Sequence, residues 1–254
     1  MNLAYWWMFP ASIVIASFAM TVGVGGPVFF SPIFILVFGF SPPLAFGTAL
    51  MTQVFGFASG TISYARQKLI DFSISRDLLV VAIPFAVIGA LVSGRIDHWM
   101  LTALFGIWTI ISALIMFRTA NDEKRLGSGI VESEVNVRFG QFLSALGGAT
   151  VGLTSTGMGN VIVPWMNVYC KMPIKKTVAT SVFIVFITVL AAALTYFFTT
   201  PLDVDMLIFT VPGVLIGGQI GPRISKQVDP VALKIVMSIV FFGIGLIMLA
   251  SLVR

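Results

Sequence analysis

Two glycine-rich breaks interrupt apolar stretches of this 254-residue chain, and each holds residues suited to binding an anion. A helix that begins inside such a break has unpaired backbone N–H groups and a partial positive charge at its first turn. Glycine lets an anion approach that backbone closely. We expect these helices to begin near Pro27, a residue favoured in a first helical turn, and near Asn160. The candidate binding residues at the two breaks are Gly25, Gly26, Ser155, Thr156, Gly157, Gly159 and Asn160.

Hydroxyl and amide side chains within the neighbouring apolar stretches are candidates to complete the same site. Gln53 lies about nine residues into its stretch, which places it near mid-membrane at about 1.5 Å per residue. An amide there needs a hydrogen-bond partner, so we interpret it as functional. Thr48, Thr180 and Ser181 are further candidates. Such hydroxyls also bond back to their own helix, and both interpretations of them stay open.

Two arginines, Arg95 and Arg223, follow or end apolar stretches at corresponding places in the two halves of the chain. One interpretation is that their side chains reach the membrane interface while their stems stay in apolar surroundings. The alternative is that each attracts anions into a vestibule on one side of the membrane. Neutralising either one would then weaken anion binding.

The composition is that of an integral membrane protein. Apolar residues make up 58% and charged residues 10% of the chain, against about 25% charged in soluble domains. The single Cys170 and single His98 leave no basis for a disulfide, a metal cluster or any other cofactor. The net charge of +5 lies in short loops beside apolar stretches, which favours membrane topology over nucleic-acid binding.

Hydropathy and helix breakers predict an all-α polytopic membrane protein with a first repeat at 1–117, a cytoplasmic linker at 118–138 and a second repeat at 139–254. Each repeat is expected to hold one glycine-tipped, broken-helix hairpin and three transmembrane helices. Hairpin arms of about 15 residues are short for a full crossing. Re-entrant hairpins and pairs of tilted crossings both remain open. The predicted hairpins are 1–40 and 139–170, and the predicted spans are 45–64, 77–94, 99–117, 177–199, 206–222 and 231–252.

The basic residues predict the sidedness. Thirteen of the fifteen lie in four loops or in the helical turn that follows the last loop. By the positive-inside rule these loops are cytoplasmic and both termini lie on the other side of the plasma (inner) membrane. The four loops are 65–76, 118–138, 171–176 and 223–230.

The two halves repeat each other at an offset of 132 residues. This offset pairs Gly25 with Gly157, Thr48 with Thr180, Tyr64 with Tyr196, Asp71 with Asp203, and Leu114-Ile115-Met116 with Leu246-Ile247-Met248. Because each half has an odd number of full spans, the second repeat is inserted upside down. Inverted repeats with interrupted helices are typical of secondary transporters that bind their substrate at the midplane.

The chain resembles the TauE/SafE family of sulfite exporters over nearly its whole length. The resemblance lies in Gly23-Val24-Gly25-Gly26-Pro27 followed by Pro32 and by Thr48-Ala49-Leu50, and in Gly157-Met158-Gly159-Asn160 followed by Pro164 and by Thr180-Ser181-Val182. Pro27, Asn160 and Ala49 depart from the family pattern. The resemblance implies a carrier of sulfite, of organosulfonates such as sulfoacetate, or of related sulfur oxyanions.

The sequence is compatible with these functions to different degrees. A secondary transporter with a small anion as substrate and the lipid bilayer as surroundings explains the paired breaks best. An anion channel of the same architecture is the alternative. A membrane scaffold or receptor leaves the breaks unexplained, and an intramembrane enzyme lacks a nucleophile with a base. The oligomeric state does not follow from the sequence.

Overall fold

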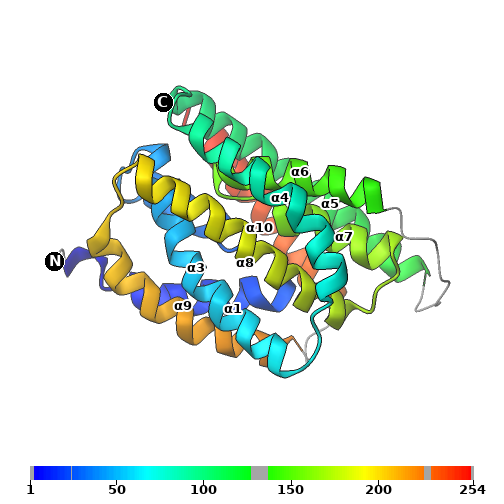
Figure 1. Cartoon of the computed structure of the whole chain (residues 1–254). Helices are drawn as coiled ribbons and strands as arrows, with labels where there is room; N and C mark the ends of the chain where they lie inside the picture. The colour runs from blue at the N-terminus through cyan, green and yellow to red at the C-terminus, as the bar shows by residue number, and fades with distance from the viewer. Residues whose placement is uncertain (1–2, 24, 127–136, 226–229, 253–254) are drawn as a thin grey trace.

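The computed structural model describes residues 3–23, 25–126, 137–225 and 230–252, and all regular structure in those ranges is helical. There are ten α-helices, with a short 3-10 helix before α1 and a π-helical turn after α7 (Figure 1). The helices are η1 (Leu3–Tyr5), α1 (Met8–Val22), α2 (Pro27–Leu36), α3 (Pro42–Arg66), α4 (Phe72–Ser93), α5 (His98–Leu126), α6 (Val137–Thr154), α7 (Met158–Pro164), η2 (Trp165–Tyr169), α8 (Ile174–Thr199), α9 (Val204–Ile224) and α10 (Pro230–Ala250).

Five of the described helices are long and apolar enough to cross a membrane: α4, α5, α8, α9 and α10. Helix α3 has 25 residues but is not in this group. Its sequence contains glycines and polar side chains such as Thr48, Thr52 and Gln53, all three fully buried. These residues lower the mean hydropathy of α3, and they lie on the face of the helix that is buried within the protein.

The hairpin arms are shorter than the spans. Helices α1 and α2 have 15 and 10 residues, which correspond to about 22 Å and about 15 Å of helix. Both are well below the roughly 30 Å of a hydrocarbon core. These lengths favour a first hairpin that turns back within the membrane, while α6 of the second hairpin has 18 residues. Whether the hairpins are re-entrant stays a prediction.

The predicted linker at 118–138 begins inside a helix. Helix α5 continues beyond the predicted span end at 117, to Leu126, and α6 begins at Val137. Residues 127–136 of the linker lie outside the described residues, so the assignment of this segment to the cytoplasmic side stays a prediction.

The helices of the two halves are intermixed rather than segregated. Helix α1 packs on α9 and α6 packs on α4, while α3 and α8 contact each other and α5 lies along α10 (Figure 1). Helix α8 is the most enclosed of the five long helices, because 67% of its most apolar stretch of 18 residues is buried. The first arm of each hairpin therefore packs against a helix from the other half.

Two threonines make matching contacts across the halves. The Thr48 hydroxyl oxygen accepts a hydrogen bond from the Asp203 backbone N at 3.3 Å, and the Thr180 oxygen accepts one from the Asp71 backbone N at 3.0 Å. Each aspartate then caps the next helix, because its carboxylate accepts from backbone N–H groups of the first turn of α4 or α9.

Two tyrosines make matching contacts, each within its own half. The Tyr64 hydroxyl donates to the Met20 carbonyl at 2.9 Å, and the Tyr196 hydroxyl donates to the Gly152 carbonyl at 3.0 Å. The offset of 132 relates the two donors and also the two acceptors. These matching contacts of the threonines and tyrosines support the predicted repeat, and its inversion across the membrane stays a prediction.

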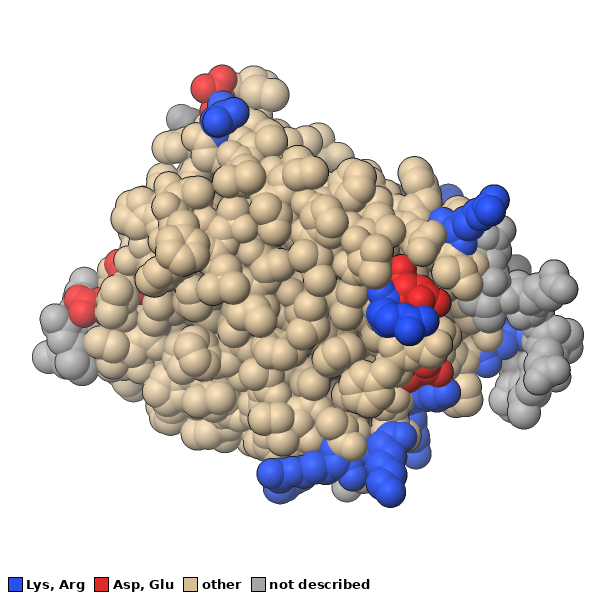
Figure 2. Space-filling view, in the orientation of Figure 1, with Lys and Arg blue, Asp and Glu red and all other residues tan. Residues whose placement is uncertain are grey.

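Charged residues avoid a broad apolar surface. Figure 2 shows this surface across the middle of the molecule, with Lys and Arg gathered mainly at the lower and right-hand end. The turn joining α3 to α4, drawn in cyan at the bottom of Figure 1, lies at that end. This distribution is typical of a protein with its apolar band in lipid and one basic side.

Candidate functional site

The first break forms because α1 ends in a glycine that adopts a left-handed conformation. Gly23 has φ 76° and its N–H bonds to the Ala19 carbonyl, which caps the helix. Helix α2 then begins at Pro27, as predicted. The Gly23 carbonyl accepts a hydrogen bond of 2.8 Å from the Ser181 hydroxyl of α8. Ser181 thus holds this tip in place, close to the candidate glycines.

Gln53 lies directly over the first tip. A Cβ added to Gly26 would lie 2.6 Å from Gln53 Cδ and 2.7 Å from Gln53 Oε1, so the amide fills the space that only glycine leaves open. Gln53 is fully buried, and neither its Oε1 nor its Nε2 has a hydrogen-bond partner. Gly25, beside it, is buried but has room for a Cβ, whose nearest neighbour would be Pro27 Cδ at 3.7 Å.

The second break is built from two residues in unusual backbone conformations. Ser155 has φ 61° and Gly157 has φ 132°, a value that disfavours any side chain. Helix α7 begins at Met158, two residues before the expected position, so Asn160 lies in its first turn. Asn160 is 1% exposed and both atoms of its amide lack a partner, as does the hydroxyl of Thr156, also 1% exposed.

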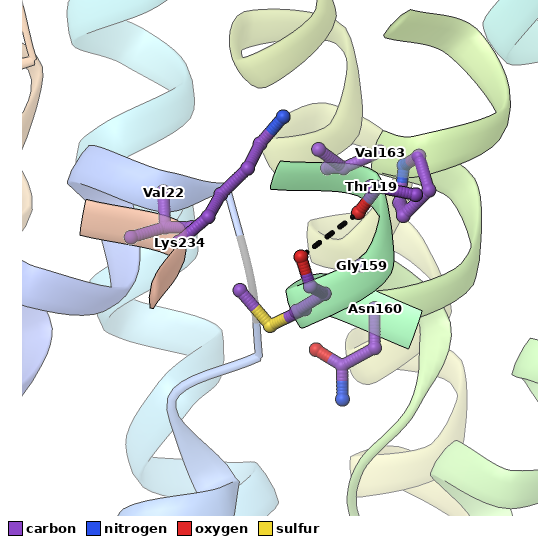
Figure 3. A pocket seen from close by; sticks show the side chains of 8 residues that line it. Val22, Thr119, Gly159, Asn160, Val163 and Lys234 are labelled. Carbon is purple, nitrogen blue, oxygen red and sulfur yellow. Dashed lines mark hydrogen bonds between the residues drawn. The ribbon is translucent and has the colours of Figure 1, made fainter. Parts of the chain in front are cut away.

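The two hairpins contact each other at their tips. The Ser31 hydroxyl, in the second turn of α2, lies 2.7 Å from the Ser155 hydroxyl. Val22, at the end of α1, lines the same small pocket as Gly159 and Asn160 (Figure 3). The pocket has a volume of about 10 Å³, enough for one water molecule. The breaks therefore meet inside the protein, as expected of a shared site.

Lys234 is a residue of this region that the sequence did not single out. It lies four residues after Pro230, and the sequence grouped it with the cytoplasmic basic residues. In the structure it lies within α10, is 3% exposed and donates to Asn167 Oδ1 at 3.2 Å. Its stem lines the pocket beside Asn160, while its ammonium points away from the Asn160 amide (Figure 3). The available signal was a lysine followed by a long run that is apolar except for Ser238.

Four candidates lie elsewhere. The hydroxyl oxygens of Thr48 and Thr180 are bonded to the loops before α9 and α4, so we assign them a structural role. Arg95 and Arg223 are exposed, just after α4 and in the last turn of α9. Neither arginine has a described contact with the tips, and their vestibule role stays a prediction.

The tips thus present buried amides, a buried hydroxyl and the first turns of two helices, with no carboxylate among the described groups that form them. The profile of the family described as "Sulfite exporter TauE/SafE" matches residues 8–248. The chain belongs to the TauE/SafE family. That assignment covers both breaks, both hairpins and every long helix.

Relatives of this TauE/SafE protein agree in length and general function. YunE of Bacillus subtilis (strain 168) is 25% identical over 244 residues, which cover 88% of this chain and 89% of YunE. YjnA of the same organism is 28% identical over 237 residues, covering 88% and 91%. MJ0441 of Methanocaldococcus jannaschii is 25% identical over 246 residues, covering 89% and 88%. Each is named a probable membrane transporter protein. No solved structure is significantly similar to the chain.

Proposed function

We propose that this TauE/SafE protein is a secondary transporter that exports small sulfur oxyanions, such as sulfite or sulfoacetate, across the plasma (inner) membrane. The observation that carries the proposal is the pair of buried amides, Gln53 and Asn160, that have no hydrogen-bond partner at the two tips. A buried amide without a partner costs about 1–3 kcal/mol, and such groups are rare outside functional sites. A bound ligand with several oxygen atoms would satisfy their N–H donors.

The helix starts support an anion rather than a cation as that ligand. Helix α2 begins directly after Gly25 and Gly26, and α7 begins directly after Gly157 and has Gly159 in its first turn. Their free N–H groups add partial positive charge on the side where the hairpins meet. The substrate would lie between the tips near the midplane, and the two hairpin units would rock against each other to open it to either side.

The membrane potential supplies the driving force in this mechanism. With the basic loops cytoplasmic and the termini on the other side, an inside-negative potential drives each monovalent anion outward by about 2.3 kcal/mol per 100 mV. The ten acidic residues lie in predicted loops or at span ends, so proton coupling through a carboxylate inside the membrane is not part of the proposal.

Thermal unfolding of the detergent-purified protein tests the proposal. Sulfite, sulfoacetate, taurine, thiosulfate, sulfate and chloride are compared, and a ligand at 100 times its Kd should stabilise the protein by about 2.7 kcal/mol. We expect a selective response to sulfite or to sulfonates. Flat curves for every anion would overturn the proposal.

Asn160→Leu is the variant that links this response to the tips. Leucine has the same number and branching of side-chain heavy atoms, although it is larger, and it removes the unpaired amide. We therefore expect little change in stability without ligand and loss of the anion response. Thr188→Val is the matched control, because Thr188 is fully buried but bonds to the Ile184 carbonyl of its own helix. It should keep the response.

A further inference from the structure

Helix α5 packs against α10 with one face, and another of its faces carries polar side chains near the second tip. Gly106 and Ile110 pack against α10, where a Cβ on Gly106 would lie 2.9 Å from Leu249 Cγ. Trp108 and Ser112, one helical turn apart, lie on a different face. A Cβ added to Gly157 would meet Thr150 Oγ1 and lie 2.5 Å from Trp108 Nε1, so the indole N–H is next to the Cα of the tip glycine. The Thr150 hydroxyl already bonds to carbonyls of its own helix.

The polar atoms of Trp108 and Ser112 are buried and have no hydrogen-bond partner. Ser112 is fully buried, yet its hydroxyl does not bond back to its own helix. Other hydroxyls of α5 do so, since Thr102 and Thr109 donate to the carbonyls four residues earlier at 2.9 Å and 2.7 Å. The indole N–H is a donor only. Ser112 shares a face of α5 with Met116 and Thr119, which line the pocket beside Asn160. With Thr156, next to Gly157, three buried hydrogen-bonding groups at or near this tip lack partners.

Packing within the repeat does not account for these residue types. The offset of 132 matches Leu114-Ile115-Met116 to Leu246-Ile247-Met248. By the same offset, Val240 and Ile244 of α10 are the repeat equivalents of Trp108 and Ser112. Aliphatic side chains therefore suffice at the equivalent positions of the second repeat. At these two pairs of positions, only α5 carries hydrogen-bond donors.

We propose that Trp108 and Ser112 bind the transported oxyanion, with the indole N–H and the serine hydroxyl donating to its oxygen atoms beside Gly157. This inference rests on the proposed function and adds two specificity residues to its site. Directional donors favour an anion that carries several oxygens, such as a sulfonate or sulfite, over chloride. Thr156 is the third hydrogen-bond donor to the anion at this tip, and Gln53 is the donor at the first tip.

The test measures binding and the indole N–H itself. Protein labelled with ¹⁵N at the tryptophan indoles is titrated with sulfite and, separately, with sulfoacetate, and the Trp108 signal is identified by its loss in Trp108→Phe. We expect that signal to move downfield on binding, as an N–H donating to an anion does. Trp108→Phe and Ser112→Ala should each raise Kd by about tenfold or more, as loss of a hydrogen bond to a charged group predicts.

Matched controls separate donation from packing. Trp99→Phe changes a tryptophan that is 63% exposed, and Thr109→Val removes a buried hydroxyl that is bonded to its own helix. Both should leave Kd unchanged. If wild-type protein binds sulfite or sulfoacetate but the Trp108 signal stays still and both variants bind normally, this inference is wrong and the proposed function stands. If wild-type protein binds neither probe, both are wrong.

Discussion

Gly26 and Gln53 constrain each other at the scale of single residues. The amide occupies the space where a Cβ on residue 26 would be, and both of its polar atoms lack a partner. The glycine at this position therefore leaves space for the Gln53 amide, in addition to easing the backbone conformation of the tip. Any side chain at residue 26 would push the flexible end of Gln53 away from the tip.

A double-mutant cycle tests this coupling. We expect Gly26→Ala to fold, because a flexible side chain can move aside, and to lose most of the anion-induced rise in Tm. Gln53→Ala should lose a similar part of it. If Gly26→Ala acts by displacing the amide, it should add little in the Gln53→Ala background. Additive losses would show that residue 26 contacts the substrate independently of Gln53.

Gly25→Ala is the control for backbone effects in that cycle. A Cβ fits there, 3.7 Å from Pro27 Cδ, without moving Gln53. Folding should be unchanged. A loss of anion response in this variant, with Gln53 undisturbed, would place the ligand against Gly25 itself.

At the scale of helices, glycines let helices from the two halves approach until their backbones are in contact. A Cβ on Gly152 of α6 would lie 2.6 Å from the Ala90 backbone N of α4, and it would also meet the Ala86 carbonyl. In the pair α9 and α1, a Cβ added to Gly217 of α9 would lie 2.6 Å from the Ile13 carbonyl oxygen of α1. Close approach through small residues is a common mode of helix packing in membranes.

Gly152→Ala should therefore destabilise the protein by about 1–3 kcal/mol or more, because backbone atoms cannot move aside as a side-chain end can. Gly243→Ala in α10 is the matched control, since a Cβ there meets nothing within 4 Å. It should be neutral or stabilising by up to about 1 kcal/mol through helix propensity. Thermal unfolding in detergent measures both. Equal Tm values for the two variants would contradict the backbone packing at α4 and α6.

At the scale of the whole molecule, an ion pair connects the two halves at the start of two spans. Lys176 Nζ of α8 lies 2.8 Å from Asp71 Oδ2, and the Asp71 carboxylate also caps α4. The hydrogen bond from Lys176 holds the pKa of Asp71 below its ordinary value, with smaller help from the backbone N–H of Ile74 and Ser73, although burial opposes this. The corresponding cap, Asp203, accepts from Met206 N.

The lowered pKa predicts how stability depends on pH. A carboxyl whose pKa is lower in the folded state contributes stability above its unfolded pKa of about 3.9, and that stability is lost as pH falls through the folded pKa. Asp71→Asn should reduce this acid-side loss and lower stability near pH 7 by no more than about 1 kcal/mol, because the pair is partly exposed. Asp203→Asn, which keeps a good capping residue, should change less. Tm measured from pH 3 to pH 7 checks both, and identical profiles for the two variants would refute the role of Lys176.

Much of the architecture follows from local properties of the sequence. Apolar runs, prolines and glycines predicted the long helices, because each helix needs only its own length and hydropathy to be recognised. The breaks were predictable for the same reason, since glycine at residues 23 and 157 is needed for backbone conformations that other residues disfavour. The chemical character of Gln53 and Asn160 could also be predicted, because a buried amide needs a partner wherever its helix lies.

Partners across the fold could not be predicted from the sequence, because they depend on how helices far apart in the chain approach each other. The sequence left Thr48 and Thr180 as binding candidates, and packing engages them with the loops before α9 and α4. It placed Lys234 with the basic loops, and the contact of α10 with α5 and α7 buries it. It gave Trp108 no role, since only folding brings that indole to Gly157, 49 positions along the chain. Helix periodicity shows which residues share a face, and the packing of whole helices determines what that face meets.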